Sequence, residues 1–177
     1  MKKIAVVALD PLAGASYTKE VRDLFGEYAE VVGYSVRDGS AAGVLPRADL
    51  FAISTDAYGS AEEEARHVPI DSQIMSIEVT FYWETLKKLF EIPQGTKVLF
   101  VNVTSNMARE AITQLSSLGV NHLQIIPYYP GAVLEEPVDI AVTPGESRFV
   151  PPSVKTVIDC DHRPCSYGMM VEIALRL

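Results

Sequence analysis

The chain has 177 residues, of which 48% are hydrophobic and 21% are charged, and its formal net charge at neutral pH is −8. This composition is ordinary for a globular protein of one or two small domains. The acidic balance argues against a nucleic-acid surface, because phosphate binding needs clustered lysine and arginine side chains. No apolar run approaches the ~20 residues of a membrane span and no signal peptide is recognisable, so we expect a cytoplasmic protein with reduced thiols.

The first half of the chain alternates strand and helix patterns. Short runs of apolar and β-branched residues, closed by turn residues, are typical of buried strands. The predicted elements are, in chain order, strand Ile4–Leu9, helix Tyr17–Phe25 with Ser16 as its cap, strand Glu30–Val36, strand Ala48–Ser54, helix Ala61–His67 and strand Gln73–Val79.

The second half repeats this plan after a break near residue 80. Its predicted elements are helix Phe81–Phe90, strand Lys97–Val103, helix Met107–Leu118, strands Leu123–Ile126, Val138–Val142 and Thr156–Asp159, and helix Ser166–Leu177. We expect the apolar side chains of helix Phe81–Phe90, including Trp83, to be mostly buried. The alternation predicts an α/β protein with two lobes of mostly parallel strands, one formed by residues 1–79 and the other by residues 80–160.

Polar residues collect just after several of the predicted strands. Open α/β sheets bind small ligands at the carboxyl ends of their strands, so these residues are candidates for a binding site. The candidates are Ser54, Thr55, Asn102, Thr104, Ser105, Asn106, Tyr128, Thr143, Glu146, His162 and Arg163. An anion could use the hydroxyls and free backbone N–H groups of residues 104–106, and Arg163 could hold a carboxylate or phosphate with two hydrogen bonds.

Each of these candidates also has a purely structural interpretation. Residues 104–106 could simply cap the following helix, and the Pro-Gly turn after Thr143 could be selected for its backbone geometry. Asn102 could tie down a loop instead of facing a ligand. Arg163 could form a hinge salt bridge to Asp159, Asp161 or Glu146. The sequence leaves these alternatives open.

Two kinds of enzyme were considered and are not favoured. Cys160 and Cys165 lie on one short loop, whereas a two-thiol racemase needs one thiol on each face of its substrate. A dinucleotide-dependent dehydrogenase needs a glycine-rich motif after its first strand, where this chain has Asp10-Pro11-Leu12-Ala13-Gly14. Two cysteines and three histidines also make a structural metal site improbable on spacing. We therefore expect a binding module with no cofactor or metal.

Several segments resemble the N-terminal sensory region of bacterial sigma-54-dependent, Fis-type transcriptional regulators. They are KKIAVVAL at the start, LFGEYAEVVGYSVRDGS, VLFVNVTSNMAREAI, IIPYYPG, DIAVTPGE and the closing VEIALRL. The resemblance extends distantly to the sensory domains of propionate-catabolism regulators, and it implies two Rossmann-like lobes around a cleft. It also implies that the segment 161–177 returns to the first lobe and leads to PAS and ATPase domains that this chain does not contain.

The resemblance implies a signal-sensing regulatory domain that binds a small anionic metabolite in the cleft. It implies no direct contact with nucleic acid and no membrane association. The alternative is a protein-interaction or dimerisation module without a small ligand, and self-association as a homodimer is left open in both cases. If the first interpretation holds, residues of both lobes, Ser54 and Thr55 among them, line one pocket together with Arg163.

Overall fold

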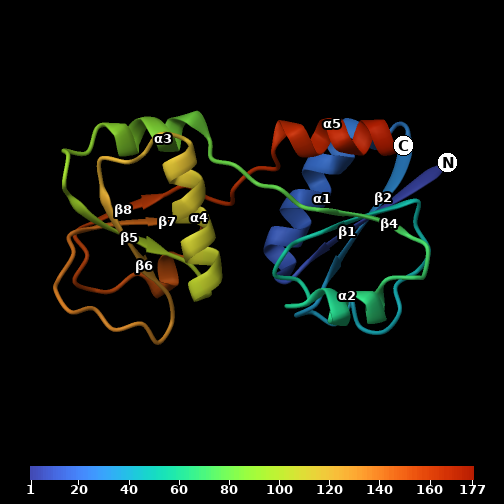
Figure 1. Cartoon of the computed structure of the whole chain (residues 1–177), viewed down its shortest axis with the longest axis horizontal. Helices are drawn as coiled ribbons and strands as arrows, with labels where there is room; N and C mark the ends of the chain where they lie inside the picture. The colour runs from blue at the N-terminus through green and yellow to red at the C-terminus, as the bar shows by residue number, and fades with distance from the viewer. The chain divides into compact units, whose positions relative to one another are not determined.

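The computed structural model describes residues 1–177, which form two compact units. Lobe 1 consists of residues 1–79 and 164–177, and lobe 2 consists of residues 80–163. Each lobe contains a four-stranded, all-parallel sheet flanked by helices, which confirms the predicted α/β class with two Rossmann-like lobes (Figure 1). The sequence analysis placed the second boundary at residues 160 and 161, whereas the division falls between Arg163 and Pro164.

Lobe 1 is built on a sheet of strand order β2-β1-β3-β4. Its elements are β1 (Lys2–Ala8), α1 (Pro11–Phe25), β2 (Ala29–Ser35), β3 (Leu50–Ile53), α2 (Ala61–His67), β4 (Gln73–Ser76) and α5 (Tyr167–Arg176). Helices α1 and α5 pack on one face of this sheet through Val21, Met169 and Ile173, while α2 lies on the other side (Figure 1). The side chains that cover this second face come from the loops around α2, with Ala41, Leu45, Ala57 and Val68 buried there. Both faces are thus covered, as the continuous apolar runs of β1 and β3 require.

Helix α1 begins six residues earlier than the sequence pattern predicted. The cap is Asp10, whose carboxylate accepts a hydrogen bond of 2.9 Å from the backbone N–H of Leu12, and Ser16 lies within the helix. Pro11 occupies the first turn, where a missing N–H costs nothing because that group would have no partner inside the helix. The residues between the first predicted strand and the predicted helix therefore form the first part of α1.

Lobe 2 has the strand order β6-β5-β7-β8. Its elements are α3 (Trp83–Phe90), β5 (Lys97–Val101), α4 (Ser105–Ser117), β6 (Gln124–Tyr128), β7 (Ile140–Thr143), the 3₁₀ turn η1 (Ser147–Phe149) and β8 (Thr156–Asp159). Leu89, Phe100 and Leu115 are fully buried in the core between α3, α4 and the sheet. Pro127 lies within β6, which is tolerated because β6 is an edge strand and needs hydrogen bonds on one side only.

The expectation for the buried side of α3 is corrected in one respect. Leu86 and Leu89 are buried, but 63% of Trp83 and 41% of Phe90 are exposed to solvent. These two rings lie near each other, with 6.4 Å between their centroids, so they form an exposed aromatic pair outside the core. None of the five helices is long and apolar enough to cross a membrane.

Candidate functional site

Each sheet has a switch point at its central strand. In lobe 1, β1 lies between β2 and β3, and in lobe 2, β5 lies between β6 and β7. The connections leaving the two neighbouring strands diverge at such a point and leave room for a ligand beyond their carboxyl ends. In lobe 1 the switch point lies between Asp10 and Ser54, and in lobe 2 it lies between Asn102 and Thr143.

Two buried polar side chains mark the switch point of lobe 2. Asn102 directly follows β5 and is 3% exposed, and Thr143 is the last residue of β7 and is fully buried. Phe100 of β5 pairs with Val142 of β7, so the two polar residues lie at the ends of neighbouring strands. The carboxamide oxygen of Asn102 accepts a hydrogen bond of 2.8 Å from the N–H of Val103, and Thr143 Oγ1 accepts one of 3.0 Å from the N–H of Glu146.

Helix α4 begins at Ser105, three residues after Asn102. Thr104 caps it, because its Oγ1 accepts a hydrogen bond of 3.2 Å from the N–H of Met107. The structural interpretation of Thr104 is therefore confirmed. A single cap satisfies one of the four N–H groups in the first turn, so the same end of the helix keeps donors and a partial positive charge for an anion. Ser105 is half-buried and Asn106 is exposed at this end.

Arg109 is a cation at this end of α4 that the sequence analysis did not select. It is exposed, and its Nε donates a hydrogen bond of 3.3 Å to Ser105 Oγ, four residues earlier on the same face of the helix. The spacing from Ser105 to Arg109 was the signal in the sequence, since residues four apart on a helix are neighbours. The helix start thus carries a full positive charge in addition to its dipole.

The loop after Thr143 is held in place by Asp159 at the end of β8. One oxygen of this carboxylate accepts hydrogen bonds of 2.9 Å from the N–H groups of Gly145 and Asp161, and the other accepts one of 2.7 Å from Ser147 Oγ. Glu146 forms an ion pair with Arg148 at 3.0 Å. The turn is therefore a rigid structure, and Glu146 already has a cationic partner.

Arg163 forms an ion pair with a helix of its own lobe. Its Nη2 lies 2.7 Å from Oε2 of Glu110, its Nη1 donates to Gln114 at 3.0 Å, and its guanidinium lies over the ring of Phe81 at 5.4 Å. The side chain is only 10% exposed. The expected salt-bridge partners Asp159, Asp161 and Glu146 are not its partners, because the chain turns Arg163 back onto α4. The neighbouring residue, His162, packs edge-on against Tyr82.

The remaining candidates lie at strand ends as predicted. The backbone N–H of Ser54 donates to the carbonyl of Val7 at 2.8 Å, which continues the sheet of lobe 1 by one residue, and Thr55 beyond it is exposed. Tyr128 ends β6 and packs partly against the second core of lobe 2. Ser54 and Thr55 belong to lobe 1 and the others to lobe 2, so their contact with one common ligand stays a prediction.

The two cysteines are unreactive core residues of different lobes. Cys160 belongs to lobe 2 and Cys165 to lobe 1, and both are free thiols with exposed fractions of 7% and 8%. Burial raises the pKa of each thiol to about 12, with Asp159 adding to the effect at Cys160 and Glu20 at Cys165. A neutral thiol is a poor nucleophile and a poor metal ligand. No group of three or more histidine, cysteine and acidic side chains is placed to hold a metal ion.

No family model matches the chain, and no curated protein or solved structure is significantly similar to it. The feature that combines buried polarity, a helix N-terminus and an exposed cation is the carboxyl edge of lobe 2, formed by residues 102–109 and 143–147.

Proposed function

We propose that the chain is a signal-sensing regulatory domain of a sigma-54-interacting transcriptional regulator, and that it binds a small anionic metabolite at the carboxyl edge of lobe 2. The observation that supports this most directly is the pair of buried polar side chains, Asn102 and Thr143, at the ends of the neighbouring strands β5 and β7. The oxygen of each side chain accepts a hydrogen bond from a nearby backbone N–H, which fixes both side chains at the switch point, and the carboxamide of Asn102 also carries N–H donors that suit a ligand.

The ligand class follows from the charges at this edge. The chain as a whole is acidic, with a net charge of −8, and would repel an anion. At the start of α4 the helix dipole and Arg109 together reverse this locally. Asn102 and Thr104 add polar groups that can orient a carboxylate or phosphate. A small organic acid or phosphate ester therefore suits this edge better than a cationic ligand does.

In this proposal the chain senses and does not catalyse. The ligand would control the PAS and ATPase domains of the regulator, which make up its output and lie outside this chain, and the sensing domain would not touch DNA itself. A ligand can shift such an equilibrium only by its difference in affinity between the two states. The net charge of −8 is compatible with a sensor that does not contact DNA.

A thermal-shift screen of organic acids, amino acids and phosphate esters tests the proposal. A ligand at ~100 times its dissociation constant should stabilise the folded state by about 2.7 kcal/mol. The decisive variant is Asn102→Asp, which keeps the oxygen that accepts from Val103 but removes the amide donor and adds a negative charge. We expect it to abolish the shift caused by an anionic hit.

The matched control for this variant is Asn121→Asp. It makes the same chemical change in the same lobe, but at the other end of α4, which stops at Ser117. An anion that stabilises wild type and the Asn121 variant but not the Asn102 variant supports the site. Equal stabilisation of all three proteins would place the ligand elsewhere, and no stabilisation by any metabolite would contradict the sensing function.

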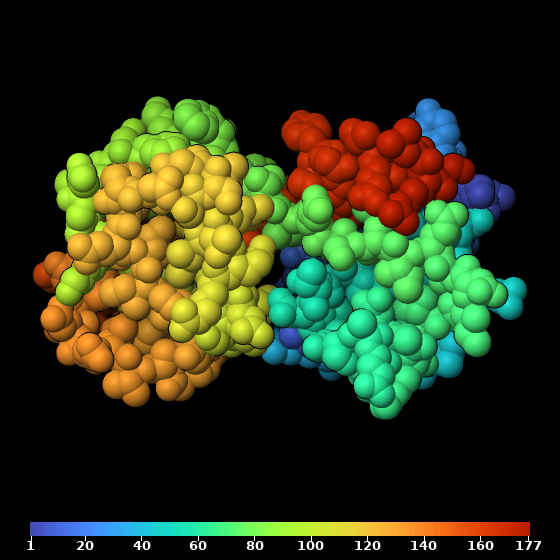
Figure 2. Space-filling model, viewed as in Figure 1, coloured from blue at the N-terminus to red at the C-terminus, as the bar shows by residue number.

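One observation favours the second candidate function, a dimerisation module. The outer face of α5 is uncharged, since its exposed residues are Tyr167, Gly168, Val171, Ala174 and Leu175, and Figure 2 shows this helix on the surface of lobe 1. Tyr167 is 90% exposed and Leu175 is 82% exposed. Exposed helix faces normally carry charged residues, and a continuous apolar stripe indicates an interaction surface.

This stripe suits a second copy of the same chain. Its large residues lie at equal spacings of four on either side of Val171, so an antiparallel pair of α5 helices would place each Tyr167 against the Leu175 of the other copy. Glu78 lies beside the start of the helix, 3.4 Å from Ser166 Oγ, and Arg176 lies near its end. Arg176 is already paired with Glu172 of the same helix, so the apolar stripe and not these charges favours the pairing of two copies. Sedimentation of wild type and Val171→Glu decides this: a concentration-dependent dimer that the variant loses supports it, and a monomeric wild type excludes it.

A further inference from the structure

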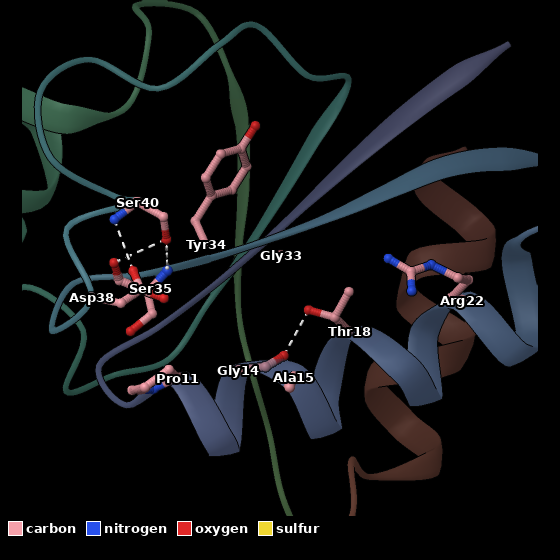
Figure 3. A pocket seen from close by; sticks show the side chains of 10 residues that line it. All are labelled: Pro11, Gly14, Ala15, Thr18, Arg22, Gly33, Tyr34, Ser35, Asp38 and Ser40. Atoms are coloured by element: carbon pink, nitrogen blue, oxygen red, sulfur yellow. Dashed lines mark hydrogen bonds between the residues drawn. The ribbon is translucent and has the colours of Figure 1, made fainter.

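Lobe 1 has a cavity of its own, which shares no residue with the site proposed in lobe 2. It has a volume of about 340 Å³ and lies between α1 and the open edge of β2. Figure 3 shows Gly33 at its centre, Arg22 at one end, and Asp38, Ser35 and Ser40 at the other. The volume is at the lower end of the range for small-molecule sites.

The wall of the cavity on the sheet side is a strand edge. β2 pairs with β1 only, and the N–H of Val36 donates to the carbonyl of Ala8, so the even-numbered residues of this strand face β1. In a parallel ladder the backbone groups of successive residues point to opposite sides. The N–H and C=O groups of Val31, Gly33 and Ser35 therefore face outward, toward the cavity.

The carbonyl of Val31 and both backbone groups of Ser35 already have hydrogen-bond partners within the chain. Arg22 Nη2 donates to the carbonyl of Val31 at 2.9 Å. The N–H of Ser35 donates to Ser40 Oγ at 2.7 Å, and its carbonyl accepts from the N–H of Ala41 at 2.9 Å. Gly33 lies between them, is exposed, and has no side chain to cover its amide groups. A longer peptide cannot extend the sheet here, because both neighbouring positions are blocked.

The uncovered amide of Gly33 presents one donor next to one acceptor. The ligand group that matches this pair has an acceptor next to a donor, which is the arrangement in a primary carboxamide, a lactam or the edge of a nucleobase. Arg22 adds a positive charge: it is exposed and forms no ion pair within the chain. Asp38 adds an acceptor at the opposite end, since hydrogen bonds from the hydroxyl and the N–H of Ser40 lower the pKa of this carboxyl group.

We propose that this cavity is a second binding site, which takes a small planar molecule with a carboxamide or lactam edge and an anionic arm. The edge pairs with the N–H and C=O of Gly33, and the anionic arm reaches Arg22. The donor and acceptor of Gly33 favour the carboxamide or lactam edge, Arg22 favours the anionic arm, and the volume of about 340 Å³ limits the size of the ligand.

The test uses the full chain and backbone amide NMR of Gly33 during titration with four probes. Uridine 5′-monophosphate has a lactam edge and an anion, uridine has only the edge, and ribose 5-phosphate has only the anion. Nicotinamide mononucleotide replaces the lactam by a carboxamide. We expect the Gly33 amide to shift with the first probe, and its dissociation constant to be roughly ten- to a hundredfold lower than those of uridine and ribose 5-phosphate. Comparison of nicotinamide mononucleotide with uridine 5′-monophosphate shows whether the cavity prefers a carboxamide or a lactam.

Ala15→Leu fills the cavity from an exposed position of α1, and Ala65→Leu makes the same change at an exposed position of α2. Leucine is nearly as good a helix former as alanine, so neither change should unfold the lobe. Binding that is lost in the first variant and kept in the second supports the site. Equal shifts with ribose 5-phosphate and uridine 5′-monophosphate, or no shift of Gly33 with any probe, would overturn it. Asn102→Asp changes lobe 2 and leaves this cavity in lobe 1 intact. A failure of the cavity proposal can therefore be distinguished from a failure of the sensing-site proposal.

Discussion

At the scale of single residues, two arginines of lobe 2 have opposite roles. Arg163 is 10% exposed and paired with Glu110, whereas Arg109 is exposed and lies at the start of α4. We predict that Arg163→Ala lowers the free energy of unfolding by roughly 1–3 kcal/mol, because Gln114 and Glu110 lose a charged hydrogen-bond partner. Arg163→Lys should recover part of this loss, since lysine cannot reproduce the two-pronged contact.

Arg109→Ala is the control for this prediction. It should leave the unfolding free energy nearly unchanged, because an exposed arginine contributes little to stability, and it should weaken an anion bound at the start of α4. Urea denaturation and ligand titration of both variants provide the measurement. If Arg163→Ala weakens ligand binding without affecting stability, then Arg163 belongs to the site and its pairing with Glu110 is incidental.

The two buried thiols predict a loss of stability at alkaline pH. Burial raises the pKa of Cys160 and Cys165 from the ordinary value of 9.0 to about 12, so the folded state keeps both thiols neutral where the unfolded state ionises them. The resulting contribution to stability is fully present below pH 9 and is lost as the pH rises toward 12. The difference in unfolding free energy between wild type and the Cys160→Ala, Cys165→Ala double variant should therefore shrink across this range. A constant difference would contradict the prediction.

At the scale of secondary-structure elements, α1 and β2 approach each other closely at one glycine. A Cβ atom on Gly33 would lie 2.4 Å from Oγ1 of Thr18, a buried side chain that donates a hydrogen bond to the carbonyl of Gly14. We predict that Gly33→Ala destabilises the protein by roughly 1–3 kcal/mol through overpacking. Gly168→Ala is the control, because a Cβ there meets nothing closer than 3.8 Å and alanine favours the helix. Thermal denaturation should show a lower melting temperature for the first variant and an equal or higher one for the second.

Elements with a strong local pattern could be predicted from the sequence, and those defined by distant contacts could not. The buried strands β1, β3 and β5 follow from continuous apolar runs, and α2 from its polar pattern and its end before Pro69. The predicted start of α1, with Ser16 as its cap, was wrong, because Asp10 caps the helix and Pro11 begins it. The exposure of Trp83 was missed because an aromatic residue in a helix is usually buried.

In the candidate site, too, local sequence patterns could be predicted and contacts between distant residues could not. The strands β5 and β7 could be predicted from the sequence to within two residues at their carboxyl ends, so Asn102 was selected as a polar residue in an apolar run and Thr143 as the residue after one. The partner of Arg163 could not be, since Glu110 is 53 residues away in the chain and only the packing of α4 brings it near. The cavity beside β2 left no signal in the sequence either, because its central groups belong to the backbone of Gly33.

At the scale of the whole molecule, the two lobes differ in how the chain builds them. Lobe 2 is one continuous segment with its own core, whereas lobe 1 needs α5, which contributes the fully buried Met169 and Ile173. We predict that residues 80–163 fold when produced alone and that residues 1–79 alone do not. The control joins residues 1–79 to 164–177 by a short linker, which is feasible because Val79 and Cys165 form an antiparallel bridge, with Cα atoms roughly 5 Å apart. Near-ultraviolet circular dichroism distinguishes folded from unfolded segments; a fully folded 1–79 segment would contradict the prediction.

Because lobe 1 is made of two separate segments of the chain, its parts are synthesised at different times on the ribosome. One face of the first sheet must wait for α5, which is made only after residues 80–166 have been added. At typical rates of synthesis this takes on the order of ten seconds, long enough for lobe 2 to fold first if it behaves as an independent unit. During that time Ile4, Val6 and Leu50 lack part of their final cover. The middle of the chain would thus be native before its beginning, and the first sheet would keep an incompletely covered apolar face until synthesis reaches α5.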